Sequence, residues 1–245
     1  PGLASVIPLV CSFLAALLAT GVGQLLPLDT PLAIIAAIII LLPGLTLTIG
    51  VGEVAAGHLS AGAARLTGAL VHFLLLGLGI AAGSGMLPES PTGIEPSAIL
   101  SPTAAMLVVA AGLVVLFRAR VHHIPWMLLG VALAVHLPAL LTTSTPGLGL
   151  FGVAATIGLA GNALSRSLQI PAQVLTLPGI LLLVPGAKGL QGVGAMLRHD
   201  PEGVSALVDS VATSGALVAG LLVAGVLFPP AFSQPVLREE GQPAV

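Results

Sequence analysis

The sequence predicts an all-α fold, a polytopic helical bundle integral to a membrane, with an inverted-topology repeat and two Pro-Gly-broken helices. Composition, the spacing of apolar segments and one duplicated motif support this prediction. Of the 245 residues, 56% are hydrophobic and 7% are charged, and the mean hydropathy is +1.13. A soluble domain carries about 25% charged residues. Because the chain is so apolar, we expect a lipid bilayer as a partner. The seven basic residues are scattered along the chain and form no patch, so we expect no nucleic acid.

The apolar segments have the length of membrane-spanning helices. Such a helix needs roughly 20 mostly apolar residues. Eight segments approach this length, three before residue 84 and five after residue 100: 3–26, 31–51, 59–83, 101–118, 124–142, 148–165, 171–194 and 204–228. The glycines and prolines inside them are compatible with this prediction, because neighbouring helices and cavities can satisfy the backbone groups that they free.

The third and fourth apolar segments are separated by a stretch of different composition. Residues 84–100 are polar, proline-rich and acidic, with no Lys or Arg. Such a composition is typical of a linker. We therefore expect a first bundle at residues 1–83, a linker at 84–100, a second bundle of five helices at 101–230 and a polar tail at 231–245.

One motif occurs twice in the chain. The segment LDTPLAIIAAIIILLPGLTLTIGVG at 28–52 aligns with IPAQVLTLPGILLLVPGAKGLQGVG at 170–194, so that Pro43-Gly44 corresponds to Pro185-Gly186. Five crossings separate the two copies, and because five is odd, the copies enter the membrane from opposite faces. Secondary transporters with such inverted repeats bind their substrates between broken helices near the middle of the membrane.

The two Pro-Gly breaks are therefore the expected site. Each break frees backbone groups, and the helix that starts after it carries partial positive charge, which suits a carboxylate. Hydroxyl, amine and amide side chains lie beside both breaks, and an acid follows the first. The candidate substrate-binding residues are Pro43, Gly44, Thr46, Thr48, Glu53, Pro185, Gly186, Lys188 and Gln191.

Both breaks lie in segments that resemble a known family. LLPGLTLTIGVGEVAAGHLSAGAARL at 41–66 is similar to the first-half motif of the threonine/serine exporter family of bacteria and fungi. RVHHIPWMLLG at 120–130 and PAQVLTLPGILLLVPGAKGLQGV at 171–193 are similar to its second half. The resemblance implies export of threonine and serine by a multi-pass protein of the bacterial cytoplasmic (inner) membrane. It also implies two halves of five helices, so residues 1–83 would be the last three helices of the first half, with two helices missing before residue 1.

The resemblance extends to single positions. Besides both breaks, Glu53 falls on an acidic position that is usually Asp, and Arg65 falls on the Arg that closes the first motif. Three positions differ from the family pattern: Ile49 replaces a polar residue, Gly52 a basic one and His58 an acidic one. These differences bear on the substrate more than on the fold.

Ionisable residues inside apolar segments are candidates for proton coupling. They are Glu53, Asp209 and His72. Each has a simpler alternative: Glu53 can be a solvated acid near a helix end, Asp209 can lie in a wet vestibule, and His72, like His136, can be a neutral residue hydrogen-bonded between helices.

Asn162 and Arg65 are candidates for helix bridging or for the substrate pathway. Asn162 can bridge helices or face the substrate. Arg65 can anchor the helix at the cytoplasmic surface instead of binding a carboxylate. His122 and His123 have no partner ligands at metal-binding spacing, so we expect no metal and no cofactor.

The remaining motifs disfavour an enzyme. Ser60, Ser205 and Ser214 have neither a nucleophile-elbow context nor an evident base, and no GxxxxGK loop is present, which argues against an ATP-driven pump. We expect a secondary transporter, proton-coupled and working by alternating access, with a small amino acid and protons as partners and a homo-oligomer as a further option. A passive channel, a transporter of another small solute and a structural membrane protein remain alternatives. Convergence of the candidate side chains on one cavity would favour transport, and dispersal would favour a structural role.

Overall fold

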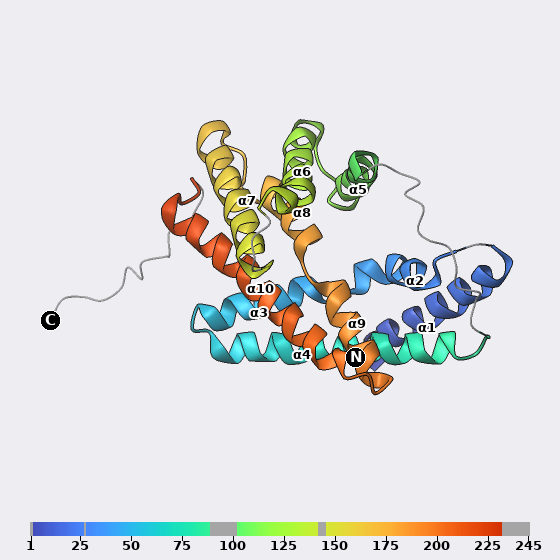
Figure 1. Cartoon of the computed structure of the whole chain (residues 1–245). Helices are drawn as coiled ribbons and strands as arrows, with labels where there is room; N and C mark the ends of the chain where they lie inside the picture. Colours follow the sequence, from blue (N-terminus) through green and yellow to red (C-terminus); the bar gives the residue numbers. More distant parts are fainter. Residues whose placement is uncertain (1, 27, 89–101, 142–145, 232–245) are drawn as a thin grey trace.

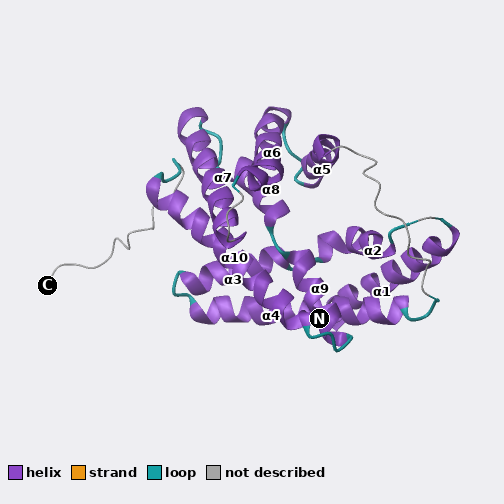
Figure 2. Cartoon of the chain, in the orientation of Figure 1, coloured by secondary structure: helices purple, strands orange, loops and turns teal. Residues whose placement is uncertain are grey.

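The fold was obtained as a computed structural model that describes residues 2–26, 28–88, 102–141 and 146–231 (Figure 1). Every element in these ranges is a helix (Figure 2). Most of the expected linker and all but the first residue of the expected polar tail lie outside the described residues.

The described α-helices, in chain order, are α1 (Gly2–Leu25), α2 (Thr30–Ile38), α3 (Gly44–Ala55), α4 (Leu59–Ser84), α5 (Pro102–Leu116), α6 (Ile124–Leu140), α7 (Pro146–Leu168), α8 (Gln173–Leu183), α9 (Gly186–Leu197) and α10 (Glu202–Leu227). Short 3-10 turns at Ile39–Leu41 and Val121–His123 extend α2 and precede α6.

The helices agree with the expected membrane spans, with two differences. Six spans in the described part of the chain are long and apolar enough to cross a membrane, among them α8 and α9 taken together as Gln173–Leu197. The expected span at 31–51 is a pair, α2 with α3, bent by 55° at the break. The expected span at 101–118 is shorter, because α5 has 15 residues and ends before Arg118, which adopts a left-handed backbone conformation with φ 48°. The chain is a multi-pass membrane protein.

The two breaks have nearly the same backbone conformation. Leu42 and Val184 are extended, with φ/ψ of -66°/123° and -62°/128°, and Pro43 and Pro185 follow with -80°/29° and -81°/40°. Proline has no N–H for the helical ladder, and it forces the preceding residue out of the helical conformation. The same local sequence therefore ends one helix and starts the next in the same way at both sites.

The helix packing repeats along the chain. Helix α4 packs on α1 as α10 packs on α7, and α2 packs on α1 as α8 packs on α7. Helix α3 lies against α4 and α10, while α9 lies against α10 and α4. The helices α1–α4 thus correspond to α7–α10, and each half-helix after a break packs on the last helix of both halves.

Glycines set the register of this repeat. A Cβ on Gly79 of α4 would overlap the carbonyl oxygen of Leu9 in α1, and a Cβ on Gly220 of α10 would overlap that of Phe151 in α7. Small residues allow such close approach of helix backbones in membranes. Gly79 and Gly220 are therefore equivalent positions in the two halves.

The two expected bundles share a hydrophobic cluster. Leu190 and Val193 of α9 are buried with Phe73 and Leu76 of α4. Figure 1 shows α5 to α8 in the upper part of the view, and α9 and α10 reaching down to the group formed by α1, α3 and α4. The broken helix α2–α3 runs across the view and α8–α9 runs down it, so the two cross at their breaks instead of lying side by side (Figure 1).

Helices α5 and α6 have no counterpart in the other half of the described repeat. Helix α6 packs closely on α8, where a Cβ on Gly179 would lie 2.8 Å from the carbonyl oxygen of Gly130. Helix α2, the equivalent of α8, packs mainly on α1. Leu32 of α2 and Ile40 of the 3-10 turn that follows it are exposed.

We expect Gly220→Ala to destabilise the protein by about 1–3 kcal/mol, because the new methyl group meets the backbone of α7. Thermal unfolding in detergent measures this effect. Gly225→Ala on the same helix is the matched control, since a Cβ there has no neighbour within 4 Å. Equal unfolding temperatures for the two variants would contradict the close crossing of α7 and α10.

Candidate functional site

The two Pro-Gly breaks touch each other. A Cβ on Gly44 would lie 2.5 Å from Val184 Cγ1 and 2.9 Å from the Gly186 Cα. A Cβ on Gly186 would lie 3.2 Å from the Leu42 Cβ and 3.4 Å from the Gly44 Cα. Each glycine thus faces the other glycine and the residue before the other proline. This exchange of equivalent contacts is what a local two-fold relation requires.

Four helix ends meet at this contact. Helices α3 and α9 begin at Gly44 and Gly186, and their N-termini carry partial positive charge. The segments before the breaks, α2 with its 3-10 turn and α8, end there with carbonyl groups of partial negative charge. The contact therefore offers groups of both signs within a small region.

A chain of buried hydroxyls connects the two breaks. Thr48 Oγ1 donates to the Gly44 carbonyl oxygen at 3.1 Å and lies 3.5 Å from Ser214 Oγ. Ser214 Oγ donates to the Ser210 carbonyl oxygen at 3.0 Å, and Ser210 Oγ donates to the Pro185 carbonyl oxygen at 3.0 Å. All three side chains are at most 5% exposed. The chain therefore runs from the first break, across α3 and α10, to the second.

Sequence reasoning identified Thr48 but missed Ser210, and it considered Ser214 only as a nucleophile. A signal was present, since the two serines are four residues apart and share one face of α10. It could not be used, because nothing local to α10 indicates that this face meets the breaks.

The other residues beside the breaks do not join the hydroxyl chain. Thr46, in the first turn of α3, is half-buried, whereas Lys188 and Gln191 of α9 are exposed. The expected side chains therefore converge only in part.

Glu53 lies away from the breaks and is paired with Arg65. The Nε atom of Arg65 donates to both carboxylate oxygens of Glu53, at 2.8 and 2.9 Å, which ties the end of α3 to α4. Glu53 is 23% exposed and Arg65 is 49% exposed. Along α3, Glu53 is about 14 Å from Gly44, at 1.5 Å per residue. The pair closes the α3–α4 hairpin at the end opposite to the break.

The other ionisable candidates occupy different environments. Asp209 and His136 are exposed on α10 and α6. His72 is half-buried on α4, and its buried Nε2 atom has no hydrogen-bond partner among the described residues. The described residues contain no cluster of three or more His, Cys, Asp or Glu side chains that could hold a metal ion.

Asn162 bridges two helices. It is 7% exposed on α7, and its Nδ2 atom donates to the Ala224 carbonyl oxygen of α10 at 3.3 Å. A Cβ on Gly158, one turn earlier in α7, would lie 2.7 Å from the Ala224 Cβ. The amide therefore supports the close α7–α10 crossing.

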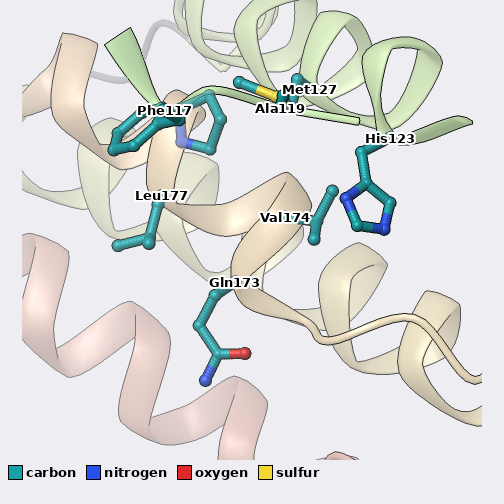
Figure 3. A pocket seen from close by; sticks show the side chains of 8 residues that line it. Phe117, Ala119, His123, Met127, Gln173, Val174 and Leu177 are labelled. Atoms are coloured by element: carbon teal, nitrogen blue, oxygen red, sulfur yellow. The ribbon is translucent and has the colours of Figure 1, made fainter. Parts of the chain in front are cut away.

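A hollow of about 180 Å³ lies between the connection of α5 to α6 and the first turns of α8 (Figure 3). Phe117, His123 and Met127 bound it on one side, and Gln173 and Leu177 bound it on the other. None of these residues belongs to the breaks or to the hydroxyl chain. The hollow is therefore separate from the candidate site.

Comparison with known families finds two matches along the chain. Residues 3–87 match a family model described as a threonine/serine exporter, ThrE, and residues 103–227, which are 125 of the 245 residues, match a second model described as Threonine/Serine exporter, ThrE. No curated protein and no solved structure matches the chain. Each match contains one of the two Pro-Gly breaks. The chain therefore belongs to the threonine/serine exporter family.

Proposed function

We propose that this protein exports threonine and serine across a bacterial cytoplasmic membrane as a secondary transporter with alternating access. The observation that carries the proposal is the contact of the two breaks, bridged by the hydroxyls of Thr48, Ser214 and Ser210. Broken helices that meet at the interface of a repeat are where transporters of this architecture bind their substrates. The family match supports the same class of substrate.

The charges at the breaks suit a free amino acid. A zwitterion carries a carboxylate, which the N-termini of α3 and α9 attract, and an ammonium group, which the carbonyl ends of the preceding segments attract. Buried hydroxyls can in addition donate to or accept from the polar atoms of a small substrate.

The packing of the half-helices supports alternating access. Because α3 and α9 each contact both α4 and α10, a shift of one break changes the packing around the other. The hydroxyl chain ends on carbonyl oxygens of both breaks, at Gly44 and Pro185, so it rearranges when either one opens.

A passive channel agrees less well with this site. A channel needs polar groups arranged along a continuous pore. Here the hydroxyls of the described site are buried between helices, and the two breaks close upon each other. A purely structural role accounts for the buried hydrogen bonds but not for two broken helices that meet at the interface of a repeat. The remaining alternative is a transporter of a different small solute. A transport assay in which other small solutes compete with threonine distinguishes it from the proposed exporter.

Glu53 is the proposed site of proton exchange. It is the more buried member of its ion pair, and protonation removes the charge that holds Arg65. Because this pair ties α3 to α4, the proton state of Glu53 then affects the half-helix that starts at the first break. The other two candidates have no such link to a break: Asp209 is exposed on α10, and His72 is half-buried on α4 with no ion pair to α3 among the described residues.

We expect inverted vesicles with the wild-type protein to accumulate radiolabelled threonine when a proton gradient is imposed, and Gly44→Ala to reduce this uptake at least tenfold. The added methyl group would lie 2.9 Å from the Gly186 Cα, which cannot move without displacing α9. Gly68→Ala on α4 is the control, because a Cβ there has open space. Unimpaired uptake by Gly44→Ala would remove the break contact from the mechanism.

Thr48→Val keeps the shape of the side chain and removes its hydroxyl. We expect a loss of about 1–3 kcal/mol of stability, measured by unfolding in detergent, because buried polar partners lose a hydrogen bond. Thr48→Ser retains the hydroxyl, and we expect it to restore threonine uptake that Thr48→Val lowers. If both variants transport alike, the hydroxyl of Thr48 has no part in transport.

We expect Glu53→Gln to abolish the pH dependence of threonine transport. Its effect on stability should stay below about 1 kcal/mol, because the lost ion pair is partly exposed. Uptake rates across a pH series, with unfolding temperature as the control, test this expectation. An unchanged pH profile would exclude Glu53 as the proton-exchanging group and direct the same test to Asp209→Asn.

A further inference from the structure

A second hollow, of about 280 Å³, lies beside the hydroxyl chain. Side chains of α3, α4 and α10 line it: Leu47, Leu66, Thr67, Leu70, Phe73, Leu207, Ser210 and Val211. Ligand pockets for drug-sized molecules measure about 300–1,000 Å³. The hollow is therefore of a size for a small solute.

Equivalent positions of the two halves line this hollow. Leu66 and Leu207 lie at the same distance along their helices from the equivalent glycines Gly79 and Gly220, and so do Leu70 and Val211. Both halves thus contribute equivalent positions to its walls. Inverted-repeat transporters bind their substrates at such an interface.

The two sides of the hollow differ in chemistry. On the side of α10, Ser210 lines the hollow with its hydroxyl, whereas Phe73 of α4 lines it with an aromatic ring. The side of α4 also carries Leu66, Leu70 and Thr67, so it is mostly apolar. A ligand in the hollow therefore meets a hydroxyl on one side and an aromatic ring on the other.

Gly189 of α9 packs against both Phe73 and Ser210. A Cβ on this residue would lie 2.7 Å from Phe73 Cζ and 3.2 Å from Ser210 Oγ. Any larger residue would overlap the ring of Phe73. The missing side chain at Gly189 therefore lets α9 pack directly against both groups, which form part of the wall of the hollow.

Ser210 Oγ has the capacity to accept a hydrogen bond. Its proton is donated to the Pro185 carbonyl oxygen at 3.0 Å, and a hydroxyl has two acceptor lone pairs besides its single donor. A ligand hydroxyl that donates to Ser210 Oγ completes this arrangement.

We propose that the side chain of the exported amino acid binds in this hollow, with its hydroxyl donating to Ser210 Oγ and its carbon atoms against Phe73 and Leu47. Ser210 is then the residue that selects hydroxylated substrates. This inference rests on the proposed export of threonine and serine, and it assigns the recognition of the substrate side chain to named residues.

The test compares L-threonine with L-valine, which has a methyl group in place of the hydroxyl. In uptake by inverted vesicles, Ser210→Ala is expected to lower the threonine-to-valine ratio of kcat/KM about tenfold, because one hydrogen bond to the substrate is lost. Loss of the bond to Pro185 alone would slow both substrates equally and leave this ratio unchanged. Ser205→Ala, at an exposed serine of the same helix outside both the hollow and the hydroxyl chain, is the control and should keep the wild-type ratio.

A second variant tests the hollow without touching the hydroxyl chain. Val211 lines the hollow and is 47% exposed, so Val211→Trp fills the space with little cost to folding. We expect threonine uptake to fall at least tenfold at an unchanged unfolding temperature. Val204→Trp, at an exposed position of the same helix outside the hollow, should transport normally.

The outcomes distinguish this inference from the proposed function. Threonine uptake by the wild-type protein, together with an unchanged ratio in Ser210→Ala or a wild-type rate in Val211→Trp, would overturn the inference and leave the exporter standing. Failure of the wild-type protein to transport threonine or serine at all would overturn both.

Discussion

The contact between Gly44 and Gly186 is the constraint on which the rest of the structure depends. Each proline ends a helix for local reasons, but only a residue without a side chain after it lets the two breaks touch. Their contact brings four helix ends to one place and sets α3 and α9 between α4 and α10. The hydroxyl chain and the hollow between α3, α4 and α10 exist because these helices cross there.

The two halves are not independent bundles. Helix α9 contributes Leu190 and Val193 to the core formed by α1, α2 and α4, while α3 packs on α10. A movement at one break therefore alters packing in both halves. In a bilayer this coupling depends on close van der Waals packing and interhelical hydrogen bonds, because lipid provides no hydrophobic force between helices. The glycines at the α1–α4 and α7–α10 crossings serve that packing.

The backbone of the repeat is nearly symmetric, whereas its side chains are not. The hydroxyls of Thr48, Ser210 and Ser214 have the apolar counterparts Leu190, Ala69 and Phe73 in the other half, all of them buried. The two halves also differ in packing, because α6 packs closely on α8 and the described residues include no equivalent partner for α2.

The sequence by itself determined the features that depend on neighbouring residues. Hydropathy placed the chain in a membrane, and Pro43 and Pro185 located both breaks, because proline acts on the backbone within a few residues. Tertiary structure decided which side chains meet: Ser214 reaches Thr48 across 166 positions of sequence, while Lys188 remains exposed. Such contacts depend on how α3 crosses α10, and this packing is determined by the surfaces of both helices and by no local pattern in either one.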